Sequence, residues 1–120
     1  MKTLLFIGFG GAAGAVLRAL VSTWLNPKSG FPFGTLSVNI IGAFLLGFLT
    51  AYTTTRIDPA WRPIIGTGFL GGLTTFSTFS IETVQLLQGD QWKTGIIYLL
   101  AQMILGLSMG ALGLYLGRSL

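Results

Sequence analysis

The residues best suited to ion chemistry lie at 71–80, which reads Gly-Gly-Leu-Thr-Thr-Phe-Ser-Thr-Phe-Ser. Two adjacent glycines precede five hydroxyl side chains, all within an apolar segment at 61–88 that is long enough to cross a bilayer. Glycine costs about 1 kcal/mol per residue in a helix, and Ser and Thr bond back to nearby carbonyls. We therefore predict a membrane helix broken at mid-membrane, a feature that recurs at ion and substrate sites. The alternative is a glycine-rich packing kink.

The predicted break offers two opposite electrostatic environments at close range. Freed main-chain carbonyls before the break suit a hard cation, which prefers oxygen ligands. The half-helix that starts near Thr74 has its positive dipole end at the same place, which favours an anion. The positive ring edges of Phe76 and Phe79 favour an anion too. These features indicate a pathway for a small ion, preferably an anion, whose hydration shell would be replaced by Asn39, Ser77, Thr78 and Ser108.

Beyond the break, one helical face carries hydroxyls, a ring and a carboxylate. Thr75, Thr78, Phe79 and Glu82 recur at the spacing of a helix face, with Phe76 beside them. Two phenylalanines three residues apart are ordinarily core packing, which is the competing interpretation of this pair.

Two polar residues in the first two predicted spans have two interpretations each. Asn39 lies on the packing side of the second span. It is either a pore group or an amide that hydrogen-bonds a neighbouring helix, and such a hydrogen bond contributes about 1 kcal/mol or less. Arg18 shares a face with the small residues Gly11, Gly14 and Ala15. A charge at that depth pairs or points into a wet cavity, or it snorkels to the membrane surface.

The composition is that of a membrane protein. Of the 120 residues, 52% are hydrophobic and only 8% are charged, against about 25% charged in soluble domains. The basic residues stand singly between apolar runs, which is typical of loops flanking spans and excludes a nucleic-acid surface. There is no Cys or His, and the carboxylates are only Asp58, Glu82 and Asp90, so we expect no enzyme.

The apolar segments predict an all-α protein, a single four-helix transmembrane domain over residues 1–120. The expected spans are 4–25, 34–53, 61–88 and 94–116, and the first is expected to be a retained helix. A break at membrane depth needs partner surface, which favours a two-fold dimer. Basic residues are only slightly more numerous on one side than on the other, which favours insertion in both orientations.

Three ordered motifs resemble the signatures of the Fluc (CrcB) family of fluoride channels. They are Gly-Gly-Ala-Ala-Gly-Ala-Val-Leu-Arg at 10–18, Gly-Thr-Leu-Ser-Val-Asn-Ile-Ile-Gly at 34–42, and Gly-Gly-Leu-Thr-Thr-Phe-Ser-Thr-Phe at 71–79. The resemblance extends over the whole chain in length, span number and motif order.

This resemblance implies an antiparallel, dual-topology homodimer in the plasma (inner) membrane, with two pores for passive fluoride export. It also implies a central structural sodium ion held by main-chain carbonyls of Gly71 and Thr74. The residues implied at the pore are Asn39, Phe76, Phe79, Ser77, Thr78, Ser108, Arg18 and, as a vestibule carboxylate, Glu82.

Two other classes of protein share some of these features. Small multidrug-resistance transporters also have four spans and dual topology, but they depend on a carboxylate in the first span, and this sequence has none there. A structural membrane subunit would use its glycines only to pack helices.

Overall fold

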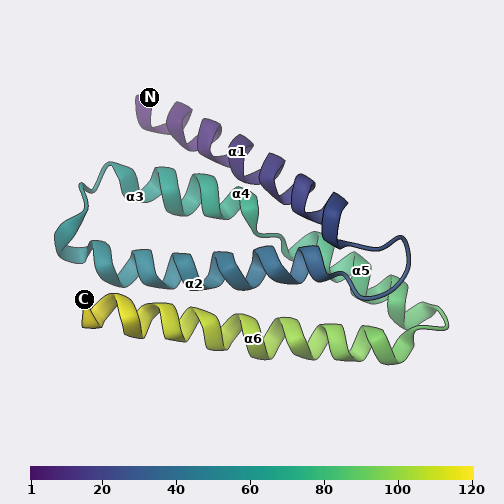
Figure 1. The fold of residues 1–120 in the computed structure, drawn as a ribbon. Helices are drawn as coiled ribbons and strands as arrows, with labels where there is room; N and C mark the ends of the chain where they lie inside the picture. Colours follow the sequence, from purple (N-terminus) through teal and green to yellow (C-terminus); the bar gives the residue numbers. More distant parts are fainter.

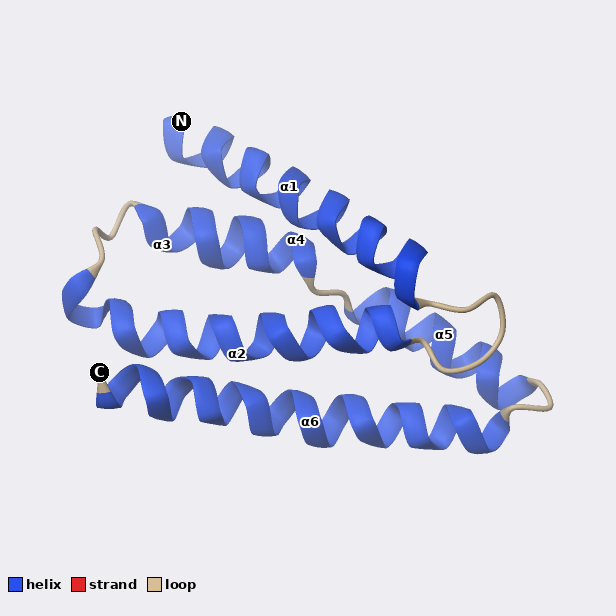
Figure 2. Cartoon of the chain, viewed as in Figure 1, coloured by secondary structure: helices blue, strands red, loops and turns tan.

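The computed structural model describes residues 1–120, apart from the side chains of Thr53, Thr54 and Thr55. The described backbone consists of helices and the loops between them (Figure 2). The helices are α1 (Lys2–Leu25), α2 (Phe33–Arg56), α3 (Trp61–Pro63), η1 (Ile64–Leu70), α4 (Gly71–Leu73), α5 (Phe76–Gln88) and α6 (Trp92–Ser119).

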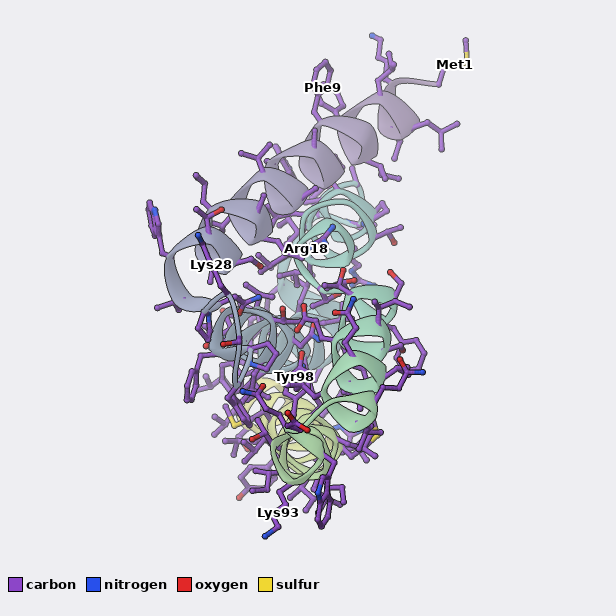
Figure 3. All side chains as sticks on the ribbon, turned by 90° about the vertical axis from the view of Figure 1, so that its right-hand side faces the viewer. Met1, Phe9, Arg18, Lys28, Lys93 and Tyr98 are labelled. Carbon is purple, nitrogen blue, oxygen red and sulfur yellow. The ribbon has the colours of Figure 1, made fainter. Side chains whose placement is uncertain are left out.

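Within the described part of the chain, four segments are long and apolar enough to cross a membrane, which is the number that the sequence predicted. They are Lys2–Leu25, Phe33–Tyr52, Trp61–Gln88 and Trp92–Ser119. Large apolar side chains on α1 point away from the other helices (Figure 3), and Phe9 is 72% exposed. Such outward-facing apolar side chains suit a lipid environment, because in an aqueous environment they would form an extensive exposed apolar surface.

The helices form an elongated bundle in which both termini lie at the same end (Figure 1). α2 and α6 run side by side along most of their length and make the most extensive helix contact. α1 crosses over the continuous α3–η1–α4 segment, whereas α5 leads away from it and packs on α6. The third segment is thus divided between two packing partners.

The division of the third segment occurs at Thr74 and Thr75. η1 is π-helical, and the N–H of Gly71 bonds the carbonyl of Gly66, five residues earlier. α4 then ends at Leu73. Thr74 (φ −87°, ψ 154°) and Thr75 (φ −152°, ψ 122°) are extended before α5 begins. The disruption therefore comes after the glycine pair, which is itself helical.

Gly72, the second glycine of the pair, serves instead to bring α1 and α4 into contact. A Cβ atom on Gly72 would overlap the carbonyl oxygen of Gly11, and one on Gly14 would overlap that of Phe69. The two backbones therefore touch directly, which the small residues on both helices allow. At Gly113 of α6, a Cβ would likewise overlap the carbonyl oxygen of Phe44 on α2.

Two small clusters of buried apolar residues lie on either side of the extended residues. One consists of Leu36, Phe79, Leu86 and Tyr98, and the other of Val38, Leu70 and Leu73. α2 thus contributes to both clusters, with α5 and α6 in the first and with η1 and α4 in the second.

Candidate functional site at the interruption of the third span

The side chain of Asn39 holds the extended residues in place. Its Oδ1 accepts a hydrogen bond from the N–H of Thr75 at 2.8 Å, and its Nδ2 donates to the carbonyl of the same residue at 3.0 Å. Both main-chain groups of Thr75 are thereby paired although they belong to no helix ladder. Nearby, a Cβ on Gly42 would overlap Cγ2 of Thr74, so this glycine of α2 makes room for the interruption.

The interruption also diverts two helical N–H groups from their usual acceptors. In a continuous α-helix, the N–H of Thr75 would bond the carbonyl of Gly71, and that of Thr78 the carbonyl of Thr74. Here Thr75 donates to Asn39, and Thr78 donates to Oγ1 of Thr75 at 3.2 Å, which caps α5. The carbonyls of Gly71 and Thr74 have thus lost their α-helical donors.

From Asn39 a chain of hydrogen bonds runs through α6 to α5. Nδ2 of Asn39 also donates to Oε1 of Gln102 at 3.3 Å. Nε2 of Gln102 donates to the hydroxyl of Tyr98 at 3.2 Å, and this hydroxyl donates to Oε2 of Glu82 at 2.9 Å. Tyr98 is fully buried (0% exposed) and points into the bundle (Figure 3). Because bulk water cannot reach Tyr98, these protein partners satisfy its hydroxyl.

A second chain reaches Glu82 from the first loop. Nδ2 of Asn26 donates to Oγ1 of Thr35 at 3.1 Å, and the Thr35 hydroxyl donates to Oε1 of Glu82 at 2.8 Å. Each oxygen of Glu82 therefore accepts from a hydroxyl, and each hydroxyl accepts from an amide. This arrangement suits an ionised carboxylate, which only accepts, and aligned donors strengthen one another.

The aromatic rings form an edge-to-face row beside these polar groups. Phe76 and Phe79 have ring centroids 5.7 Å apart, Phe79 and Tyr98 5.4 Å, and Tyr98 and Phe31 of the first loop 5.3 Å. The two phenylalanines of α5 differ greatly in burial, since Phe79 is 4% exposed and Phe76 is 74% exposed. Core packing thus describes Phe79 within one chain, but not Phe76.

Arg18 reaches from α1 to the end of α4. Its Nε donates to the carbonyl oxygen of Gly72 at 3.1 Å, and the side chain lies against the third segment (Figure 3). A cation is favoured there because a helix C-terminus carries partial negative charge. Of the two interpretations of Arg18, the structure shows pairing with a neighbouring span.

Most of the other predicted site residues line open grooves. Thr74, Phe76 and Asn39 line a groove of about 330 Å³ between α2, α6 and the interruption. Gly71 lines an adjoining groove between α2 and the third segment. A shallow groove along α5 is lined by Ser77, Thr78, Ile81, Glu82 and Gln85.

Ser108 is the predicted residue that the structure does not bring to this site. It is exposed on α6, and the residue that faces Asn39 from α6 is Gln102. Tyr98 and Gln102 stand four residues apart, so helical spacing could have identified them as a polar pair on one face. Asn26 has no such signal, because its contact depends on how the first loop folds back.

Comparison with known proteins identifies the family. Residues 5–114 match the family described as CrcB-like protein, Camphor Resistance (CrcB). A relative from Sulfurovum sp. (strain NBC37-1), named "Fluoride-specific ion channel FluC", is 44% identical over 119 residues, which cover 98% of this chain and 94% of the relative. A protein of the same name from Rhizobium meliloti (strain 1021) is 44% identical over 126 residues, covering 100% and 99%.

The family match and the four apolar segments agree with each other. The match at 5–114 includes most of each of the four described segments that are able to span a membrane, so the chain is a multi-pass membrane protein. This chain therefore belongs to the CrcB-like protein family.

Proposed function

We propose that this protein is a fluoride channel that allows passive export of fluoride across the plasma (inner) membrane. The relatives named above are fluoride-specific ion channels, and neither they nor this proposal involves an enzymatic step. The observation that carries the proposal is the interruption held by Asn39, which opens beside a groove containing the exposed ring of Phe76. A membrane face with this combination suits the passage of a small anion.

The groups along α5 can replace the water lost by an anion entering the membrane. α5 begins at Phe76, where the positive end of the helix dipole lies. The hydroxyls of Ser77 and Thr78 and the ring edge of Phe76 add donors and positive edges without a fixed charge. Weak individual interactions of this kind let an ion leave as readily as it enters.

The first test is fluoride efflux from liposomes that contain the purified protein, followed with a fluoride-selective electrode. We expect rapid fluoride release once a potassium ionophore balances the charge, and little chloride release under the same conditions. Release no faster than from protein-free liposomes would reject a channel function. Uptake of a quaternary ammonium dye would instead indicate a multidrug-type transporter. If the protein showed neither activity, the remaining interpretation would be a structural membrane subunit.

We further propose an antiparallel, dual-topology homodimer with two pores. The groove at the interruption and the groove along η1 share Leu46 and open between α2 and the third segment. A second copy in the opposite orientation would cover both. Because the chain has no cysteine, a single Ser29→Cys change in the first loop gives a clean reporter. Labelling from one side of intact cells should reach only part of the population, whereas complete or absent labelling would contradict dual topology.

The final part of the proposal is a structural sodium ion held by the carbonyls of Gly71 and Thr74. These two carbonyls have lost their α-helical donors, as described above, which suits a hard cation. Among the described residues, no group of three or more acidic, His or Cys side chains could hold a metal, which leaves main-chain oxygens as ligands. Replacing sodium by a large organic cation should lower both dimer stability and fluoride flux. Unchanged values of both would reject the site.

A further inference from the structure

We propose that Asn26, in the loop after α1, is a positioning residue that holds Glu82 in place at the mouth of the ion path. The inference deepens the proposed fluoride channel and depends on it. It assigns to the first loop a direct influence on the rate at which the anion passes.

Asn26 caps the start of α2 from outside that helix. The residue at the N-cap position of α2 is Pro32, whose side chain makes no capping bond. Oδ1 of Asn26 instead accepts from the N–H groups of Gly34 at 2.7 Å and Thr35 at 3.3 Å. This leaves Nδ2 of Asn26 directed at the hydroxyl of Thr35, 3.1 Å away. One amide thus fixes both the backbone and the side chain at the beginning of α2.

The bond from Asn26 decides where the Thr35 proton goes. A hydroxyl has a single proton, so an oxygen that accepts from an amide directs its own proton to another acceptor. For Thr35 that acceptor is Oε1 of Glu82 at 2.8 Å. Thr35 is only 1% exposed, so bulk water offers no substitute. Loss of the amide donor of Asn26 would therefore weaken the hydrogen bond that Glu82 accepts from Thr35.

Glu82 stands where two open spaces meet. It lines the shallow groove along α5 together with Ser77 and Thr78. It also lines a cleft of about 510 Å³ beneath the first loop, which Asn26, Lys28 and Asp90 line as well. Bound by two hydroxyls, the carboxylate is turned toward Thr35 and Tyr98. If one hydroxyl were withdrawn, its negative charge would be free to turn into the groove and repel an anion.

The test is Asn26→Asp in the full-length protein, reconstituted in liposomes. An aspartate keeps the acceptor for both N–H groups of α2 but has no amide proton, and it attracts the Thr35 proton to itself. We expect unchanged yield of folded protein and fluoride efflux slower by about tenfold, as for loss of a charge-assisted hydrogen bond. Ser29→Asp is the matched control, because it adds the same charge to the same loop and cleft. It should conduct at close to the wild-type rate, and equal slowing by both changes would overturn the inference.

A double-mutant experiment then shows whether Asn26 acts through Thr35. Thr35→Val keeps the shape but removes the hydroxyl, and Thr35→Ser restores the hydroxyl. Thr35→Val should slow efflux as Asn26→Asp does, the combination should be no slower, and Thr35→Ser should recover most of the rate. Additive slowing in the combination would indicate independent structural effects and refute the inference.

If the wild type conducts and Asn26→Asp conducts equally fast, only this inference fails. A wild type that conducts no fluoride would refute the channel function, and this inference with it.

Discussion

The two ends of the bundle are held together by different interactions. Toward the end that carries both termini, helices meet through glycines, with Gly14 and Gly113 lying against neighbouring backbones. Toward the end that carries the first loop, Gly34 also lies against the backbone of α1, but side-chain hydrogen bonds join the helices as well, chiefly those of Thr35, Glu82 and Tyr98. The extended residues Thr74 and Thr75 separate the two regions. We call these regions the glycine-packed half and the polar half.

The difference shows how each half would respond to change. Between spans in lipid there is little hydrophobic driving force, so association depends on close packing and on hydrogen bonds. The glycine-packed half has backbone atoms as neighbours, which cannot move aside for an added methyl group. The hydrogen-bonded groups of the polar half have side chains as neighbours, which can adopt new rotamers but then leave donors unpaired. Added bulk should therefore damage the first half, and lost polarity the second.

The largest expected effect is that of Gly14→Ala in the glycine-packed half. The new Cβ would overlap the carbonyl of Phe69 and approach the nitrogen of Leu73, so α1 must move away from α4. We expect destabilisation by about 3 kcal/mol or more, the upper range of overpacking. The measurement is the yield and thermal stability of folded protein in detergent. Gly106→Ala is the control, since nothing lies within 4 Å of its Cβ. A tolerated Gly14→Ala would show that the helices are less closely packed than described.

A smaller effect is expected for Asn39→Leu, at the boundary of the two halves. The change leaves the N–H and carbonyl of Thr75 and an oxygen of Gln102 without their partner. Because these buried groups would be unpaired, we expect a loss of about 2 kcal/mol in folding stability. We also expect much slower fluoride efflux. Ser37→Ala, on the same helix, should have neither effect because its hydroxyl bonds only within its own helix turn at an exposed position. Wild-type efflux in a folded Asn39→Leu protein would remove Asn39 from the path.

Tyr98→Phe tests the polar half with a smaller change. The ring and its contacts with Phe31 and Phe79 remain, but the hydroxyl that joins Gln102 to Glu82 is lost. We expect a loss of about 1 kcal/mol in thermal unfolding, because one central hydrogen-bonding group disappears. Tyr115→Phe, on the exposed side of α6, should have no such effect. Equal stability of the two variants would mean that the polar chains contribute little to this half.

The smallest expected effect on stability is that of Phe76→Ile. Its ring is 74% exposed, so the change should cost less than about 0.5 kcal/mol within the chain. Fluoride efflux should nevertheless fall, because an aliphatic side chain lacks the positive ring edge. Phe79→Ile should show the opposite balance, with a clear loss of stability at the buried position. Wild-type efflux of folded Phe76→Ile would show that the Phe76 ring is not part of the ion path.

The sequence was sufficient for the number of helices able to span a membrane. Bilayer thickness sets the length of an apolar segment, and each segment end carries a charge, a proline or an interfacial aromatic. The position of the interruption was less accessible. Glycine propensity indicated Gly71 and Gly72, but both are helical, with Gly72 lying directly against Gly11 of α1, and the amide of Asn39 on another span stabilises the extended form of Thr75 instead. A tertiary contact thus overrides local propensity here.

The candidate site was predictable only where its residues share a helix face. Asn39, Phe76 and Glu82 were identified because polar or aromatic groups recur at helical spacing in an apolar segment. Gln102 was passed over in favour of Ser108, since one sequence cannot fix the rotation of α6 about its axis. Asn26 lies in a loop, where spacing carries no information about contacts.

The order of donors in the polar half also has a consequence for proton leakage. A row of hydroxyls can pass a proton from one oxygen to the next, as in a water wire. Here the row from Glu82 ends at Tyr98, and the following links, Gln102 and Asn39, are amides that hold their protons firmly. The arm from Thr35 ends in the same way at Asn26. Among these side chains, amides therefore interrupt any proton relay between hydroxyls, at Gln102 on one arm and at Asn26 on the other.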